Sequence, residues 1–367
     1  MVFALQYAGL SQGRLRVAHR LHFRRLRRFL SFAGHDRTQG PVQARGNRYF
    51  AAVLSVFSTT FPFFALVLCG FAATRRGILP LASIAGLNTF VLFFALPCML
   101  YRFGAQTPVA QLLDPVVAGA YALCALLIVG GTVAWTLRRW GWNDAAFGAL
   151  VAAFPNSGFM GVPLLVALLG AGSAGTVILT MVVDMVLTTS LCIALSRLGQ
   201  AEGGAAQALR NALKGMLSNP MPWSIVLGGV ASALAWQLPA PVDRTMAMLA
   251  GAASPVALFT IGAVLARSQM NAHEHVAPRD YVPIALVKLL VHPLLVWLAC
   301  WLAQHMGLPL PRETMVALVL VAALPSASNV SLLTERFGAH GGRVARIILV
   351  STALAFVSFS CAVLLLS

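Results

Sequence analysis

The sequence predicts an all-α polytopic membrane protein with ten transmembrane helices, arranged as two inverted five-helix repeats. Composition is the first reason. Hydrophobic residues make up 59% of the 367 residues, charged residues make up 10%, and the mean hydropathy is +0.82. A soluble fold needs more charged surface than this, so lipid must surround most of the chain. The spacing of apolar runs and an internal similarity between the two halves are the other reasons.

Turn residues and charges separate ten apolar segments, and one bilayer crossing needs about 20 such residues. The segments are approximately 51–73, 82–101, 115–136, 145–169, 174–196, 221–238, 245–266, 281–304, 314–334 and 343–366. The longest polar connection, residues 198–220, follows the fifth segment. It divides the chain into a first repeat over 49–197 and a second repeat over 221–367.

Two sequence matches indicate that the halves are copies. Residues 150–155 read LVAAFP and residues 320–325 read LVAALP, in the fourth segment of each half. FPFFALVLCGFA (61–72) likewise aligns with MPWSIVLGGVA (221–231) in the first segment of each half. Two matches in the same order favour a duplication. Because each copy has an odd number of crossings, the second copy must insert upside down, as in many secondary transporters.

Residues 1–48 form a basic N-terminal extension. They hold ten of the 26 Lys and Arg residues and one acidic residue, so without them the net charge falls from +16 to +7. This confinement argues against nucleic-acid binding. A disordered extension or a mis-assigned translation start is expected. A basic amphipathic helix over residues 14–28 and a targeting segment are the alternatives.

Loop charge predicts the orientation in the cytoplasmic (inner) membrane. After residue 48, the odd-numbered loops hold twelve basic residues and the even-numbered loops hold three, namely Arg102, Arg244 and Arg312. Basic loops stay in the cytoplasm. Both termini are therefore expected outside, in the periplasm or extracellular space, and the 198–220 loop in the cytoplasm.

The fourth and ninth segments carry helix breakers at corresponding positions. Pro155 removes a backbone donor within FPNSGFMGVPLL (154–165), and Gly158 permits non-helical backbone beside Asn156 and Ser157. Broken backbone at membrane depth is tolerated only inside the protein or beside a wet cavity. The exposed N–H groups of half-helices suit an anion. Proline kinks with polar helix–helix contacts are the alternative. The corresponding residues of the ninth segment are Pro325, Ser326 and Asn329.

Three ionisable residues lie inside apolar segments, where charge is costly and usually functional. Lys288 and His292 are four residues apart and share one helix face. Lys288 is expected to attract a carboxylate, unless it reaches an interface by snorkelling. Asp184 is expected to couple a proton or ion, or to pair with Lys288. His292 is a second coupling candidate, or else a structural histidine.

No enzyme motif accompanies these residues. The six cysteines lie in apolar segments without metal-ligand spacing, and the acidic residues are scattered along the chain. Neither a catalytic residue, a cofactor nor a metal site is expected.

Taken together, four motifs resemble the auxin efflux carrier family, especially its bacterial branch of malate and malonate permeases. They are FPNSGFMGVPLL (154–165), SPVALFTIGAVLA (254–266), VKLLVHPLL (287–295) and LPSASNVSLLTERFG (324–338), and LFFALPCMLYRFG (92–104) looks like that family's second-span signature. The resemblance runs in order from about residue 55 to residue 367.

The resemblance implies that helices 4 and 9 cross near the bilayer centre and that the substrate carboxylate binds beside the crossing. Pro155, Asn156, Pro325 and Asn329 would be the crossing positions, and segments 1, 2, 6 and 7 a scaffold for an elevator-like movement. The expected function is secondary transport of a mono- or dicarboxylate such as malate or malonate, in a lipid bilayer. A sodium-coupled organic-anion symporter and a non-transporting membrane sensor are the alternatives. The sequence leaves the coupling ion, proton or sodium, and a homodimer open.

Overall fold

The computed structural model describes residues 41–198, 210, 220–270 and 276–366. Residues 1–40, most of the predicted basic extension, and most of the 198–220 loop lie outside the described residues. The chain divides into two compact units, Met1–Ser58 and Thr59–Ser367. The first helix, α2 (Pro41–Arg75), begins before the boundary expected at residue 49 and belongs to both units. The contacts below are within the second unit.

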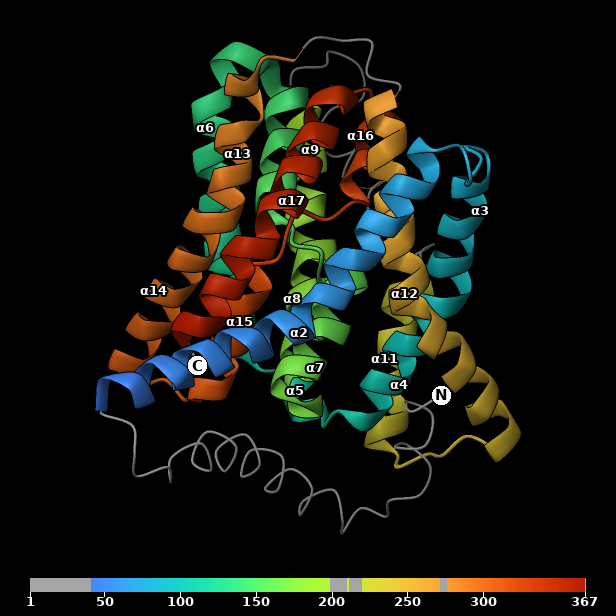
Figure 1. The fold of residues 1–367 in the computed structure, drawn as a ribbon, viewed down its shortest axis with the longest axis vertical. Helices are drawn as coiled ribbons and strands as arrows, with labels where there is room; N and C mark the ends of the chain where they lie inside the picture. Colours follow the sequence, from blue (N-terminus) through green and yellow to red (C-terminus); the bar gives the residue numbers. More distant parts are fainter. Residues whose placement is uncertain (1–40, 199–209, 211–219, 271–275, 367) are drawn as a thin grey trace. The chain divides into compact units, whose positions relative to one another are not determined.

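All regular elements in the described part of the chain are helical (Figure 1). After α2 they are α3 (Ser83–Phe90), η1 (Val91–Ala95), α4 (Leu96–Gln106), α5 (Val109–Leu112), α6 (Pro115–Ala153), η2 (Ser157–Gly161), α7 (Val162–Leu169), η3 (Ala171–Ser173), α8 (Ala174–Val183), η4 (Asp184–Thr188), α9 (Thr189–Ser196), α11 (Pro220–Ala233), α12 (Ala240–Met270), η5 (Pro278–Asp280), α13 (Val282–Leu286), η6 (Val287–Val291), α14 (His292–His305), α15 (Arg312–Ala322), α16 (Val330–Arg336) and α17 (Gly341–Leu366). The elements η1, η2, η4 and η6 are π-helical turns that continue into α-helix.

Seven of the described helices are long and apolar enough to cross a membrane. They correspond to six of the predicted segments and to a continuous stretch, Ala110–Ala153, that joins the third segment to the start of the fourth. A straight helix of the 39 residues of α6 would be about 58 Å long, nearly twice the hydrocarbon thickness of about 30 Å. The helix instead turns at Gly141, whose φ of 73° and ψ of 172° are not helical.

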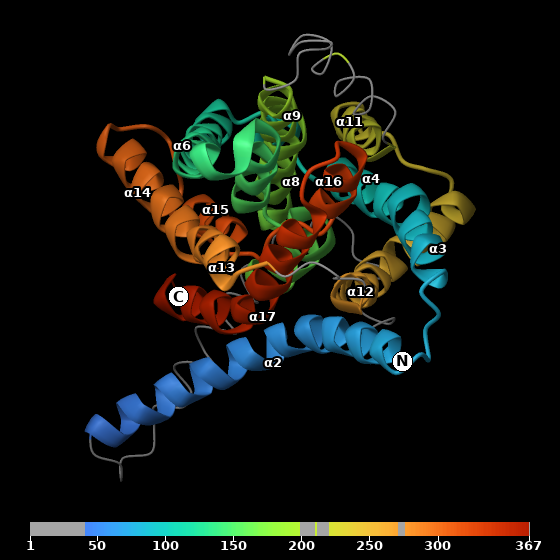
Figure 2. The same ribbon diagram turned by 90° about the horizontal axis from the view of Figure 1, so that it is seen from above.

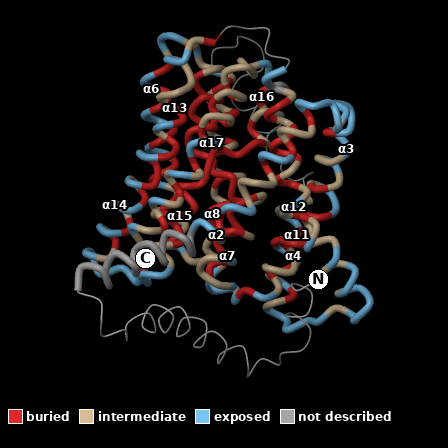
Figure 3. The backbone as a smooth tube through the Cα atoms, viewed as in Figure 1, coloured by how far each residue is buried: buried red, intermediate tan, exposed pale blue. Residues whose placement is uncertain are grey.

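Two bundles are visible within the second unit (Figure 2). Helices α3, α4, α11 and α12 lie together on one side, and we call them, with the Thr59–Arg75 part of α2, the first bundle. Helices α6–α9 and α13–α17 form the crossover bundle. Buried residues concentrate along α8, α15 and α17, whereas α3 and one side of α14 hold many exposed residues (Figure 3). The exposed side of α14 carries large apolar side chains such as Leu294 and Leu298, as a lipid-facing helix requires.

Glycines bring helices of the first bundle unusually close. A Cβ atom on Gly70 of α2 would collide with the backbone carbonyl of Phe259 in α12, and one on Gly262 would collide with the carbonyl of Val67. A Cβ on Gly104 of α4 would lie 3.3 Å from the Cα of Gly228 in α11. Small residues at helix interfaces allow this backbone approach in membranes.

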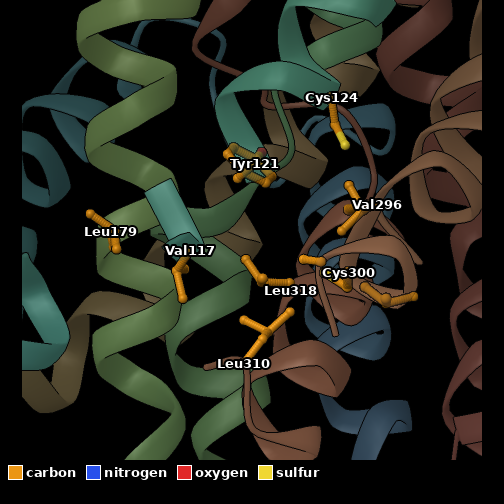
Figure 4. Packing of buried hydrophobic residues seen from close by; sticks show 11 residues of the cluster. Val117, Tyr121, Cys124, Leu179, Val296, Cys300, Leu310 and Leu318 are labelled. Atoms are coloured by element: carbon orange, nitrogen blue, oxygen red, sulfur yellow. The ribbon is translucent and has the colours of Figure 1, made fainter. Parts of the chain in front are cut away.

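The crossover bundle has an apolar core of its own. Side chains from α6, α14 and α15 face one another there, with Leu179 of α8 beside them (Figure 4). The core includes Tyr121 and Leu318, both without exposed surface. Tyr121 is the one member with a hydroxyl group, and a buried tyrosine hydroxyl usually needs a hydrogen-bond partner.

Charged contacts tie loops of the second unit together. At the odd-numbered loops, Arg139 pairs with Asp280 (2.6 Å) and Arg343 with Asp144 (3.1 Å). These pairs join the loop near Gly141 to the segments that precede α13 and start α17. At the even-numbered loops, Arg102 pairs with Asp243.

Candidate functional site: two interrupted helices

The first interruption lies after α6. The helix ends at Ala153, and Phe154 is extended with φ −89° and ψ 105°. Pro155 explains the end, because its ring disfavours helical geometry at the preceding residue and it has no N–H to donate. Asn156 is also non-helical (φ −77°, ψ 55°), and the chain resumes as the π turn η2, which leads into α7.

The second interruption lies between α15 and α16. α15 ends at Ala322, and the chain stays outside regular helix until α16 begins at Val330. Pro325 lies within this gap, at the position that matches Pro155 in the sequence repeat. The interruptions predicted at both prolines are therefore present.

The two interruptions lie against each other and exchange backbone hydrogen bonds. The N–H of Asn156 donates to the carbonyl of Pro325 (2.8 Å), and the N–H of Ala327 donates to the carbonyl of Phe154 (2.9 Å). These bonds make an isolated antiparallel bridge between Pro155 and Ser326. Each interrupted helix thus provides hydrogen-bond partners for backbone groups of the other. Such partners are needed because water is not available to these groups inside a membrane protein.

Several polar groups at this crossing have no partner. Ser326 is 1% exposed, and its N–H donates to the hydroxyl of Ser351 (3.2 Å), but its own Oγ is buried without a hydrogen bond. The Oδ1 atom of Asn329 is likewise buried and unpaired. Asn156 lies at the same crossing and is 4% exposed. Buried polar atoms are normally paired, so the crossing has unused hydrogen-bonding capacity.

A small pocket opens between the crossing and the first bundle. Its interior leaves about 20 Å³ for the centres of water molecules, which is enough to hold ordered water. The polar lining comes from Asn88 of α3 on one side and from Ser328, Asn329 and Ser331 on the other. Its apolar lining includes Phe159 of η2 and residues of η1 and α12.

Asn88 was not identified from the sequence. It lies in LNTF (87–90), among apolar residues of the second predicted segment. A single asparagine without a proline or glycine beside it gives no sign of a helix break, and only the fold places it opposite Asn329.

Lys288, Asp184 and His292 lie elsewhere in the crossover bundle. None of them lines the pocket, and each is fully buried, so Lys288 does not snorkel. The ammonium of Lys288 donates to the carbonyl of Ala322 (2.6 Å), the last residue of α15, and lies 3.2 Å from Nδ1 of His292. Asp184 accepts a hydrogen bond from the Tyr121 hydroxyl (2.7 Å).

Four of the ten predicted site residues share one further property, the local form of the helix. Ser157 and Gly158 lie in the π turn η2, Asp184 in η4 and Lys288 in η6. Single π turns within α-helices frequently occur at functional sites, because the extra residue loosens the helical hydrogen bonding.

A family model described as "Membrane transport protein" matches residues 55–363. The chain belongs to this family. It is the family of the auxin efflux carriers: residues of this chain are 26% identical to "Auxin efflux carrier component 3a" of Oryza sativa subsp. japonica over 150 residues, covering 38% of this chain and 24% of the rice protein.

Two bacterial relatives match over most of their length. "Putative malonate transporter" of Rhizobium meliloti (strain 1021) is 29% identical over 301 residues, covering 80% of this chain and 90% of the relative. "Uncharacterized transporter YfdV" of Escherichia coli (strain K12) is 25% identical over 291 residues, covering 76% of this chain and 87% of the relative. The family and these names, together with the seven apolar helices, make this chain a multi-pass membrane transporter.

Proposed function

We propose that this member of the membrane transport protein family is a secondary carrier for a small organic anion, a mono- or dicarboxylate such as malonate. One observation carries the proposal: two interrupted helices meet by backbone hydrogen bonds and leave the hydroxyl of Ser326, which can donate to a carboxylate, buried without a partner among the described residues. The name of the Rhizobium relative supports the substrate class.

In this proposal the anion lies at the crossing, next to the pocket. Amide hydrogens of Asn156 and Asn329 and the hydroxyl hydrogen of Ser326 donate to its carboxylate, together with the backbone N–H of Gly158 in η2. The N–H of Ser157 already donates to the carbonyl of Pro155 (2.8 Å). The first N–H groups of a helix have no acceptor within the helix and lie at its positive end, so they favour a negative charge. Asn88 faces the same space from α3 and supplies a second polar wall.

The proposed architecture has ten crossings in two inverted repeats. Phe154 and Pro155 align with Leu324 and Pro325 in the sequence repeat, and the two segments pair antiparallel. Equivalent segments that run antiparallel through a membrane belong to copies of opposite orientation. In the same relation α2 of the first repeat corresponds to α11 of the second, and α4 corresponds to α12. The close approach of α2 to α12 therefore has its counterpart in the close approach of α11 to α4, which supports the inverted repeat further.

The proposed movement is elevator-like. The tightly packed first bundle is the scaffold, and the crossover bundle carries the anion past it. The pocket supports this division because its lining comes from both bundles, with Ala257 and Ile261 of α12 facing Phe159 and Asn329.

Uptake of radiolabelled malonate and malate into proteoliposomes tests the proposal. A hydrogen bond to a charged group is worth about 1.5–3 kcal/mol, so Ser326→Ala and Asn329→Ala are each expected to raise the apparent KM about tenfold or more. Ser358→Ala is the matched control, because Ser358 Oγ is also buried and unpaired but lies in the middle of α17. Normal uptake by the Ser326→Ala/Asn329→Ala double variant would refute the site.

A further inference from the structure

Four ionisable side chains form one group inside the crossover bundle. Tyr121, Asp184, Lys288 and His292 each have no exposed surface. Tyr121 donates to Oδ2 of Asp184 (2.7 Å), while Lys288 lies 3.2 Å from His292. The rings of Tyr121 and His292, with centroids 5.9 Å apart, connect the two pairs. We call these four residues the ionisable cluster.

Each carboxyl oxygen of Asp184 has a hydroxyl partner, so the site can accommodate an ionised carboxylate. The Tyr121 hydroxyl donates to Oδ2, and the Thr188 hydroxyl donates to Oδ1 at 3.1 Å. Both carboxylate oxygens therefore act as acceptors. A hydroxyl can also rotate and accept, so Tyr121 or Thr188 can adjust to a protonated Asp184 without moving its backbone.

The form of His292 depends on the charge of Lys288. A lysine ammonium has donors only, so beside a protonated Lys288 the Nδ1 atom of His292 accepts and the ring hydrogen is on Nε2; a neutral amine also permits the other tautomer. That Nε2 atom is buried and has no partner in the described structure. Buried polar atoms are normally paired, so the cluster can form one more hydrogen bond at this nitrogen.

The charges of Asp184 and Lys288 do not neutralise each other by direct contact. Among the described residues, ion pairs within 4.0 Å join Arg102, Arg139 and Arg343 to their aspartates, but none joins Asp184 to Lys288. Their immediate partners are Tyr121 and His292, which can both donate and accept hydrogen bonds. The cluster can therefore change its protonation state without breaking a salt bridge.

The cluster is connected to the interrupted helix. Lys288 donates to the carbonyl of Ala322, the last residue of α15 and three residues before Pro325. The carbonyl end of a helix carries partial negative charge, which the ammonium stabilises. A change of charge in the cluster thus acts on the segment that forms one side of the crossing.

We propose that the ionisable cluster is the proton-coupling site of the carrier, with Asp184 as the group that binds the proton and Tyr121 as its positioning residue. Asp184 takes up one proton from the side where the anion enters and releases it on the side where the anion leaves. This inference rests on the proposed function. It also moves Lys288 from the substrate site, where the sequence suggested it, to the coupling site.

Charge balance gives the physical reason for coupling. With Asp184 ionised and Lys288 protonated, the cluster has no net charge. A proton on Asp184 leaves a net charge of +1, which offsets one carboxylate of the cargo. Because uncompensated charge inside a membrane is costly, anion and proton each favour the binding of the other.

Other titratable groups near Asp184 are thiols. Cys192 of α9 lies within electrostatic reach of Asp184, Cys124 of α6 lies near Tyr121, and Cys300 of α14 lies near Cys124. Cys192→Ser is therefore the control for the cluster variants, and its pH dependence is expected to equal that of the original protein.

The first test measures malonate uptake into proteoliposomes with an inward proton gradient, an inward sodium gradient or neither. Accumulation is expected with the proton gradient alone and lost on adding a protonophore. Asp184→Asn imitates the protonated side chain and is expected to keep malonate exchange while losing proton-driven accumulation. The exposed Glu313→Gln in the first turn of α15 is its matched control. Accumulation driven by sodium, or retained in Asp184→Asn, overturns the inference.

A second test separates this inference from the proposed cargo. Infrared difference spectra between acidic and alkaline buffer detect the carbonyl band of a protonated carboxyl group without any transport. The part of this band that belongs to Asp184 is expected in the full-length protein and in Glu313→Gln, and is expected to be lost from Asp184→Asn. If the band behaves so but neither malonate nor malate is taken up, the proton site is supported and the cargo is refuted. A band unchanged in Asp184→Asn refutes the proton site.

Tyr121→Phe examines the positioning role. Loss of the hydroxyl removes a donor from the carboxylate, so the pH at half-maximal uptake is expected to shift, with a smaller change in the uptake at optimal pH. Tyr281→Phe, at the start of α13, is the control and is expected to leave the pH profile unchanged. Identical pH profiles for Tyr121→Phe and the original protein contradict a role in coupling.

Discussion

At the scale of single residues, Gly161 determines how closely the two interrupted helices approach. A Cβ atom at this position would lie 2.9 Å from Cδ1 of Leu324 and 3.3 Å from Cγ1 of Val177. All three residues are buried, so Gly161→Ala is expected to lower stability by about 1–3 kcal/mol through overpacking. Thermal unfolding in detergent measures the change.

Two further variants complete this test. The double variant Gly161→Ala/Leu324→Ala removes the colliding methyl group of Leu324. Its unfolding temperature is therefore expected to exceed the value obtained by adding the effects of the two single substitutions. Gly131→Ala is the control, since a Cβ there meets no atom within 4 Å and alanine favours helix. A stable Gly161→Ala protein would show that the crossing is looser than described.

The sequence identified the site residues that are unusual in apolar helices and did not identify those that are common there. Pro155, Pro325 and the charges at 184 and 288 are out of place in apolar helices, and each was identified for that reason. Tyr121 and Asn88 are ordinary in a membrane span, so nothing in the sequence marked them. The partner of Lys288 was also unpredictable, because it is a backbone carbonyl, which every residue has.

At the scale of elements, glycine contacts hold α2 against α12. A Cβ at Gly70 or Gly262 would collide with a backbone carbonyl of the other helix, and backbone, unlike a flexible side chain, cannot move aside locally. Gly70→Ala and Gly262→Ala are each expected to lower stability by roughly 1–3 kcal/mol or more. Gly251→Ala, also in α12 but with open space around it, is expected to be neutral or slightly stabilising. Fluorescence-detected thermal unfolding of the three variants provides the comparison, and equal melting temperatures would contradict the packing.

The apolar segments were predictable in position but not in their division into helices. Hydropathy reports how far apolar residues extend, and it does not register a turn made by one glycine, such as Gly141, within an otherwise helical stretch. The third and fourth predicted segments therefore appear as one long helix with a bend. α15 and α16 appear as two short helices, because a break at Pro325 leaves neither half long enough to span.

At the scale of the whole molecule, the charged contacts agree with the loop-charge pattern. Two ion pairs, Arg139–Asp280 and Arg343–Asp144, join odd-numbered loops to each other. The third pair, Arg102–Asp243, joins two even-numbered loops. Partly exposed ion pairs contribute only about 0–1 kcal/mol each, so these contacts contribute little to stability. They show instead which loops lie at the same end of the helices.

The orientation of those ends gives a direct test of topology. Arg138 and Arg312 are both exposed, in the third and eighth loops, and the positive-inside rule predicts the third loop in the cytoplasm and the eighth outside. With the exposed Cys69 and Cys361 replaced by serine, a membrane-impermeant maleimide is expected to label Arg312→Cys in intact cells. Arg138→Cys is expected to react only after the membrane is permeabilised. Labelling of Arg138→Cys alone in intact cells would show the opposite orientation. Equal labelling of both variants would contradict an odd number of crossings between the two loops, and therefore the inverted repeat.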